Sequence, residues 1–266
     1  MKNLLLAFAL VASAQAQFFS TGNPDGKMAV ASRPGLGGKL EIEAGDDFVL
    51  DSDTSITKAS FTGLLTNGRS IADVGEVEVE IYRVFPLDSD TARTPNVPTR
   101  NNSPSDNEFA SRSLSAGELV ETASLVASSF TAANSVLNGI NPIPNQTTGG
   151  EGPVTGTEVR FDLIFFNPIS LPAGHYFFVP KVQVTKGEFM WLSAPKPIVA
   201  PGTPFTPDLQ AWIRNANLDP DWLRIGTDIV GGSTPPQFNM TFSLNDEITE
   251  ITTDSNNLFF LWFFFS

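Results

Sequence analysis

The stretch Glu76-Val77-Glu78-Val79-Glu80-Ile81-Tyr82-Arg83-Val84 alternates apolar residues with mostly charged ones. A period of two places Val77, Val79 and Ile81 on one face of the chain and the three glutamates on the other. This period belongs to a β-strand, and a single apolar face is typical of an antiparallel strand that covers a core. We therefore predict a half-buried antiparallel strand here.

The same alternation recurs along the chain, clearly at 158–166 and more briefly at 39–43 and 58–65. Further strand candidates are 28–31, 174–184, 188–193, 222–229 and 238–244. Pro180 lacks a backbone N–H, so the strand that contains it is expected to be bulged or to lie at a sheet edge. Short strands separated by turn residues predict an all-β fold, an antiparallel, jelly-roll-like β-sandwich with long loops and one or two short helices.

Two segments depart from the alternation. Residues 206–216 fit a short helix, because Thr206 is a suitable N-cap and Pro207 suits the first helical position. Residues 115–138 leave two alternatives open, one long helix or a strand followed by a short helix at 131–137. The Thr, Ser and Val content slightly favours the second. Residues 87–113 and 138–157 are polar and are expected to form long loops.

The ends of the chain predict a division into four parts. Residues 1–16 combine Lys2, an apolar run at 4–11 and a small-residue site at 14–16, the features of a cleaved export signal. The mature chain would then begin at Gln17 and would be secreted or displayed at the cell surface. We assign 17–38 to an irregular N-terminal arm, 39–245 to the β-sandwich domain, and 246–266 to a polar linker with a short apolar tail.

Composition narrows the classes of function. The chain has no cysteine, which excludes thiol catalysis and cysteine-bound zinc and favours a bacterial export product. Its formal net charge of −13 argues against nucleic acids and anionic membranes as partners. The apolar run at 258–265 is too short to span a bilayer, so we expect no full transmembrane span in the mature chain.

Enzymatic residues are sparse in this sequence. His175 is the one histidine, so a Ser–His–Asp triad would have to use it. It follows a Pro-Ala-Gly turn, and no G-x-S-x-G motif occurs. A histidine at the surface or at the entry to a strand is the better interpretation, and we predict no catalytic residues and no enzymatic activity.

Two groups of residues are candidates for binding. Asp46, Asp47, Asp51 and Asp53 could supply oxygen ligands to calcium, although the EF-hand spacing is absent and a solvated acidic turn is the simpler interpretation. No other cofactor is expected. The aromatic residues could form a sugar-stacking platform, although core filling is the simpler role for them. These aromatic candidates are Tyr82, Tyr176, Trp191, Trp212 and Trp222.

Several stretches of the mature chain resemble bacterial exported proteins of the PEP-CTERM, exosortase-sorted type. They are 23–26, 46–48, 171–180, 191–194 and 222–228. The resemblance implies a secreted or surface-displayed β-rich domain and carries no active-site residues. The C-terminus departs from that family, because it contains neither a Pro-Glu-Pro signal nor an arginine cluster.

These observations predict a non-enzymatic structural or interaction protein of the bacterial envelope or extracellular matrix. Its expected partners are extracellular polysaccharide or other surface proteins. A carbohydrate-binding module, calcium-dependent or not, is the alternative, and a secreted hydrolase is the third hypothesis.

Overall fold

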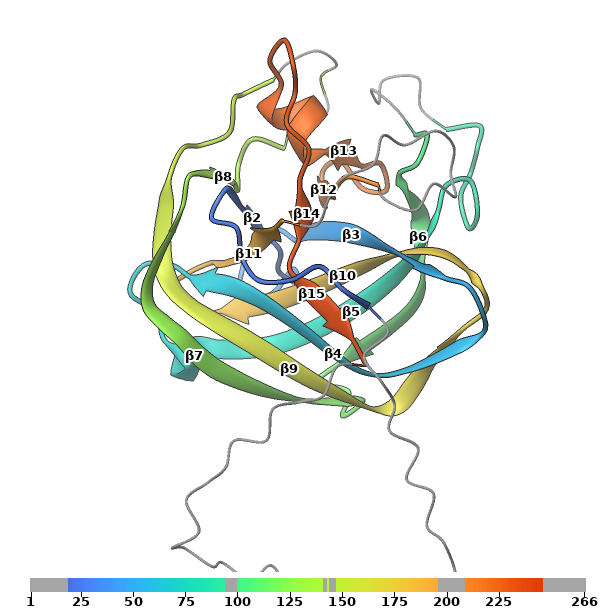
Figure 1. The fold of residues 1–266 in the computed structure, drawn as a ribbon, viewed down its shortest axis with the longest axis horizontal. Helices are drawn as coiled ribbons and strands as arrows, with labels where there is room; N and C mark the ends of the chain where they lie inside the picture. The colour runs from blue at the N-terminus through green and yellow to red at the C-terminus, as the bar shows by residue number, and fades with distance from the viewer. Residues whose placement is uncertain (1–18, 94–99, 141–142, 144–146, 196–208, 246–266) are drawn as a thin grey trace, which may run out of the picture.

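The alternating stretch lies within strand β5 (Val74–Val84) of a two-sheet sandwich in the computed structural model, which describes residues 19–93, 100–140, 143, 147–195 and 209–245. Val77, Val79 and Ile81 are fully buried between the sheets, as the period predicts. The predicted all-β, sandwich-like fold is therefore confirmed. Figure 1 shows the long strands running side by side along the lower part of the molecule.

One sheet has nine strands. Its strands are β1 (Phe19–Ser20), β2 (Met28–Ala31), β4 (Thr54–Leu65), β7 (Leu119–Ala132), β8 (Asn134–Val136), β9 (Val154–Leu171), β11 (Phe189–Ala194), β14 (Asn239–Met240) and β15 (Phe242–Leu244). The long strand β4 pairs with β9, and β9 pairs with β7 on its other side. All pairs in this sheet are antiparallel except β2 with β8.

The second sheet has six strands in the order β13-β12-β3-β10-β5-β6. Besides β5, they are β3 (Ile42–Leu50), β6 (Pro104–Ser113), β10 (Gly174–Val184), β12 (Trp212–Asn215) and β13 (Leu223–Arg224). Its inner face closes the main core, where Phe178 stacks on Phe242 with ring centroids 5.1 Å apart. Its outer face carries a second, smaller apolar cluster, which includes Tyr82, Phe177, Trp212 and Trp222.

The N-terminal arm is part of the sandwich. Strands β1 and β2 lie inside the segment predicted to be irregular, and the four residues of β2 are buried. Phe19 pairs with Leu244, so the two ends of the described chain lie together. The strand expected at 28–31 is confirmed, but the arm is not separate from the domain, because its apolar residues complete the nine-stranded sheet.

Residues 115–138 form strands. β7 and β8 occupy this segment, so the predicted short helix at 131–137 is wrong. The two strands are held by different neighbours, β9 for β7 and β2 for β8. Backbone pairing with distant strands overrides the weak local helix signal here.

The helix predicted at 206–216 is also wrong over its described part. Residues 206–208 lie outside the described residues, and Trp212–Asn215 form β12. Trp212 lies in the second apolar cluster whereas Ile213 lies in the main core. A strand buries these successive side chains on opposite faces, which a helix could not do.

Other boundaries shift as well. β6 occupies the end of the predicted loop 87–113, and β9 begins before the end of the loop predicted at 138–157. The candidate strand 222–229 is a two-residue strand followed by a π-helical turn at Ile225–Val230. A second helical turn, of the 3-10 type, lies at Ile71–Asp73. Both short helical turns therefore lie outside the segments expected to be helical.

Pro180 lies in β10, which is a central strand and not an edge strand, but the ladder of β10 with β5 shifts register between Val182 and Val184, as the bulge alternative predicts. β10 pairs with β3 from Gly174 to Phe178. Beyond Phe178, Ser32 forms hydrogen bonds to both strands in place of this pairing. The Ser32 hydroxyl donates to the Pro180 carbonyl at 2.6 Å and accepts from the Ala44 N–H at 3.2 Å. A serine from another segment thus closes the gap that a proline leaves in a central strand.

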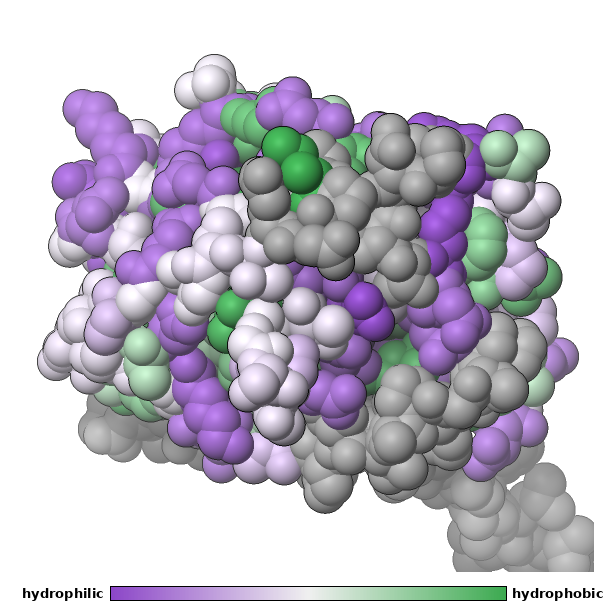
Figure 2. Space-filling model, turned by 90° about the horizontal axis from the view of Figure 1, so that it is seen from above, coloured by the Kyte–Doolittle hydropathy of each residue, from purple (hydrophilic) through white to green (hydrophobic). Residues whose placement is uncertain are grey.

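In the described part of the chain, no helix has the length and apolar character needed to cross a bilayer. Figure 1 shows β12, β13 and residues 225–230 in the upper part of the molecule, whereas β7 and β9 run along the lower side. Figure 2 looks onto the upper face, which is mainly hydrophilic outside the grey atoms.

Candidate functional site

The five aromatic residues predicted as a sugar platform are all in the interior. Their exposed fractions lie between 0% and 3%, for Tyr82, Tyr176, Trp191, Trp212 and Trp222. Trp191 belongs to the main core and donates its indole N–H to the Thr241 carbonyl at 2.7 Å. Tyr176 stacks on Phe48 in the same core. These side chains fill space, so they offer no surface on which a sugar ring could stack.

Three of these aromatics come together on the outer face of the six-stranded sheet. Tyr82, Trp212 and Trp222 belong to the second apolar cluster, and the Tyr82 and Trp222 rings meet edge-on at 5.2 Å. Next to them lie four charged side chains from different strands, Glu43, Glu80, Lys181 and Arg214. We call these four residues and Tyr82 the buried polar cluster.

Arg214 and Glu43 form the first half of the buried polar cluster. Arg214 Nη2 donates to Glu43 Oε1 at 3.1 Å, and Arg214 Nε donates to Glu43 Oε2, so the contact is bidentate. The guanidinium also lies 4.4 Å from the Trp222 ring centroid. Burial alone would raise the pKa of Glu43, but the charge and hydrogen bonds of Arg214 lower this pKa to about 2. Glu43 is therefore ionised at neutral pH.

Lys181 and Glu80 form the second half. Lys181 Nζ lies 2.7 Å from Glu80, 2.8 Å from Glu41 and 3.1 Å from Glu78, so one ammonium faces three carboxyl groups. Glu80 has the most buried side chain of the three, 11% exposed against 36% and 24%. Burial raises the pKa of Glu80 to about 8, and Glu43 adds to this shift while Lys181 opposes it. Glu80 therefore retains its proton near neutral pH.

The Tyr82 hydroxyl joins the two halves. Its oxygen lies 2.8 Å from Glu43 Oε1 and 3.0 Å from Glu80 Oε2, and it accepts from Arg214 Nη2 at 2.8 Å. A phenol has one proton, which goes to the ionised Glu43. The contact with Glu80 then needs the proton of the Glu80 carboxyl, which agrees with the raised pKa of that group. The buried polar cluster is thus internally hydrogen-bonded, and it ties β3, β5, β10 and β12 together.

His175 is buried, not at the surface, although it lies at the entry to β10 as predicted. Its Nε2 lies 2.6 Å from Asp47 Oδ2, and both side chains are fully enclosed. Asp47 Oδ1 accepts from the Leu209 N–H at 2.9 Å. No hydrogen-bond partner reaches His175 Nδ1, so the described residues place no serine hydroxyl there. The pair therefore connects β3 and β10 to Leu209, the first described residue after 195.

The four aspartates proposed as calcium ligands are not brought together. Asp46 and Asp47 are fully buried neighbours on opposite faces of β3, and Asp46 Oδ2 accepts from the Met240 N–H at 2.8 Å. Asp51 and Asp53 lie at the exposed turn between β3 and β4. Among the described residues, no group of three or more His, Asp or Glu side chains could hold a metal ion.

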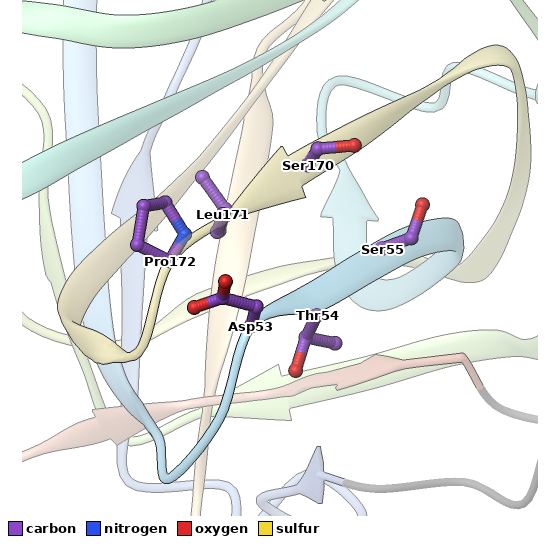
Figure 3. A pocket seen from close by; sticks show the side chains of 6 residues that line it. All are labelled: Asp53, Thr54, Ser55, Ser170, Leu171 and Pro172. Carbon is purple, nitrogen blue, oxygen red and sulfur yellow. The ribbon is translucent and has the colours of Figure 1, made fainter.

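A hollow of about 420 Å³ lies where β4 begins and β9 ends (Figure 3). Its lining residues are Asp53, Thr54, Ser55, Ser170, Leu171 and Pro172. Thr54 pairs with Leu171 and Ser55 with Ser170, so the hydroxyls come from adjacent strands. One carboxylate oxygen of Asp53 accepts from the Ala173 N–H at 3.1 Å. A carboxylate and hydroxyls beside apolar carbon suit a small polyhydroxylated ligand.

Exposed apolar side chains gather on two adjacent strands. Of the nine large apolar side chains that are exposed in the described part of the chain, five lie on β7 and β9. They are Val120, Leu125, Val126, Ile164 and Phe166, with exposed fractions from 40% to 62%. Val120 lies directly opposite Ile164 in the ladder. We call these five residues the β7–β9 apolar surface.

The charged residues of the buried polar cluster, Glu43, Glu80, Lys181 and Arg214, are not among the site residues predicted from the sequence. Lys181 gave the best available signal, because it is a cation inside the apolar run 176–182 of β10. A charge in such a run needs a buried partner. No protein-family model, curated protein or solved structure matches this chain.

Proposed function

We propose that this chain is an exported, non-enzymatic structural or interaction protein of a bacterial envelope or extracellular matrix, of the PEP-CTERM type that its sequence resembles. The observation that carries the proposal is the β7–β9 apolar surface. Leu125 and Phe166 are 59% and 62% exposed, although most large apolar side chains of the same sheet are buried. Exposed apolar groups that gather on neighbouring strands of a folded domain mark a surface for macromolecular contact.

The buried polar cluster supports a structural role in this proposal. Its carboxyl groups interact with side chains of the same chain, and Trp212 and Trp222 are buried beside it. A general acid or nucleophile must reach a substrate. The carboxyl groups of this cluster instead form hydrogen bonds and ion pairs that connect neighbouring strands. We therefore assign the cluster to the stability of the domain.

The test is where the protein goes in the bacterium that makes it. The tagged chain is expected in the envelope or matrix fraction, and the double variant Leu125→Lys, Val126→Lys is expected to shift into the medium. The matched control is Leu36→Lys, Leu87→Lys, which changes two residues that are 43% exposed elsewhere. Equal retention of both double variants, or a cytoplasmic location of the wild type, would refute the proposal.

A carbohydrate-binding role is the second candidate, and the hollow at the start of β4 favours it. The lining hydroxyls and Asp53 would bind sugar hydroxyl groups. The test is a polysaccharide pull-down and glycan array, with and without calcium. Asp53→Ala is expected to abolish retention, whereas Asp51→Ala, which changes an exposed aspartate of the same turn, is expected to leave it unchanged. Absence of wild-type binding would exclude this role.

A further inference from the structure

Among the described strands, β7 is a long edge strand. It runs for 14 residues, and in the described part of the chain it pairs with β9 alone. The backbone groups on its other side can therefore form a ladder with an added strand. Exposed edges of this length are the usual sites of strand addition between chains.

The six-stranded sheet also has a long edge strand, β6, whose residues differ in kind from those of β7. β6, which pairs with β5 alone, begins with Pro104 and carries Asp106, Glu108 and Arg112. Proline and charge are devices that prevent edge-to-edge contact. The chain thus protects one long edge and leaves the other open.

The charge on β7 is low for so acidic a protein. The chain has a formal net charge of −13, yet Glu121 is the one charged residue among the 14 of β7. Glu121 lies opposite the buried Leu163, so it belongs to the inner face of the sheet. Two copies of this molecule would repel each other less along β7 than along the charged edge β6.

The regular part of β7 is complementary to itself. From Leu119 to Leu125 it pairs with β9 without a register shift, and the shifts begin after Leu125. In an antiparallel pair of two such segments, the midpoint Thr122 lies on the two-fold axis. Val120 then faces Ser124 of the second copy, and Glu121 faces Ala123. Like charges are not opposed, and a Thr–Thr pair is favourable across two strands.

We propose that two copies of this chain associate through antiparallel pairing of β7 with β7, centred on Thr122, which joins their nine-stranded sheets into one continuous sheet. This inference rests on the proposed interaction function and names its partner. In this register the exposed Val120 and Leu125 gain cross-strand neighbours, Ser124 and Leu119 of the second copy.

The natural absence of cysteine makes the pairing register directly measurable. Single cysteines are placed on the outer face of β7 in the full chain, which is then oxidised mildly. Thr122→Cys is expected to form a disulfide-linked dimer, because the Cβ atoms of directly opposed residues lie close to the separation that a disulfide bridges. Val120→Cys and Ser124→Cys should cross-link when mixed and not when alone. Thr91→Cys, an exposed position outside β7, is the control.

A charge reversal tests the same axis without a covalent bond. Sedimentation velocity is expected to show that Thr122→Lys and Thr122→Glu each weaken dimerisation by at least tenfold, whereas their equimolar mixture restores it. Thr122 is exposed, so both variants should retain the wild-type far-UV spectrum. A wild type that stays monomeric at every concentration would overturn the inference. So would cross-linking at Val120 alone, or equal cross-linking of all the variants including Thr91→Cys.

This outcome can be separated from the outcome for the proposed function. If the purified chain dimerises with the Thr122 pattern but is not found in the envelope or matrix, the proposed function fails and the pairing stands. If the Leu125→Lys, Val126→Lys variant leaves the matrix while the purified wild type is monomeric, the function stands and the pairing fails.

Discussion

The protonation state of Glu80 is coupled to the stability of this fold. It lies on β5 within contact of Tyr82 and Lys181, and Glu43 approaches the same hydroxyl from β3. The ordinary pKa of such a carboxyl is about 4.5, and burial raises it to about 8 in the folded protein. The folded state therefore binds a proton that the unfolded state has released between these two values. In that window the contribution of Glu80 to stability falls as the pH rises.

We expect Glu80→Gln to remove this loss, because the amide stays neutral at every pH. At pH 5 the variant and the wild type should have similar free energies of unfolding. From there to pH 8 the variant should gain up to about 1.4 kcal/mol per pH unit relative to the wild type. Urea unfolding at several pH values measures the difference. Glu108→Gln, at an exposed position on β6, is the control and should follow the wild type.

Glu43 titrates in the opposite sense. Its pKa is about 2 in the folded protein, against an ordinary value of 4.5. Its contribution is therefore complete above about 4.5 and is lost as the pH falls towards 2. Glu43 and Glu80 together predict that this cluster is most stabilising at about pH 4.5 to 5, between the two windows.

Arg214→Met is expected to destabilise the protein by about 3–5 kcal/mol, because it leaves the buried charge of Glu43 unpaired. The double variant Arg214→Met, Glu43→Gln should recover much of this loss, since neither side chain is then charged. Thermal and urea unfolding of the two variants test the assignment. A double variant that is no more stable than the single one would show that Arg214 acts through packing on Trp222, not through its charge.

Among the elements, β10 shows how a central strand accommodates a proline. Ser32 follows β2 in the nine-stranded sheet, yet its hydroxyl and carbonyl bind Pro180, Ala44 and Val182 of the other sheet. This residue connects the two layers where the ladder from β3 to β10 ends. Without it, the Pro180 carbonyl and the Ala44 N–H would be buried without partners.

Ser32→Ala is therefore expected to cost about 1–3 kcal/mol of unfolding free energy, although it removes a single buried oxygen. The matched control is Ser111→Ala at an exposed position of β6, which should change stability by less than about 0.5 kcal/mol. Chemical unfolding of both variants measures the difference. Equal stability of the two would mean that another group satisfies the freed backbone atoms.

In the whole molecule, most contacts join residues that are distant in sequence. The first and last described strands, β1 and β15, pair with each other. Glu43 binds Arg214, which is 171 residues away in sequence. Such a topology closes long loops before its contacts form, so it folds slowly. It also leaves no described segment that could hold its structure without the others.

We therefore expect one cooperative unfolding transition. Fluorescence from Trp191 in the main core and from Trp212 and Trp222 in the second cluster should change together with the far-UV signal. Refolding should take milliseconds to seconds or longer. Stopped-flow and equilibrium measurements check both expectations. An earlier transition of the tryptophan signal would show that residues 209–224 unfold separately from the rest of the domain.

The sequence by itself determined the class of the fold and the inner faces of the main strands. The alternation at 76–84 and 158–166 is a local property, and a period of two has the same consequence wherever the strand pairs. Lys181, a cation inside an apolar run of β10, left a signal in the sequence, but this signal alone does not identify its partners.

The tertiary structure decided which outer faces are covered. Glu80 looks like a solvent-facing glutamate in its strand, yet it is buried and contacts Tyr82 and Lys181. The tertiary structure also decided three other features. They are the strand at 212–215, the His175–Asp47 pair and the open edge of β7. Each depends on which distant segments become neighbours, and that choice is made by the burial and hydrogen bonding of the whole chain, which no local period records.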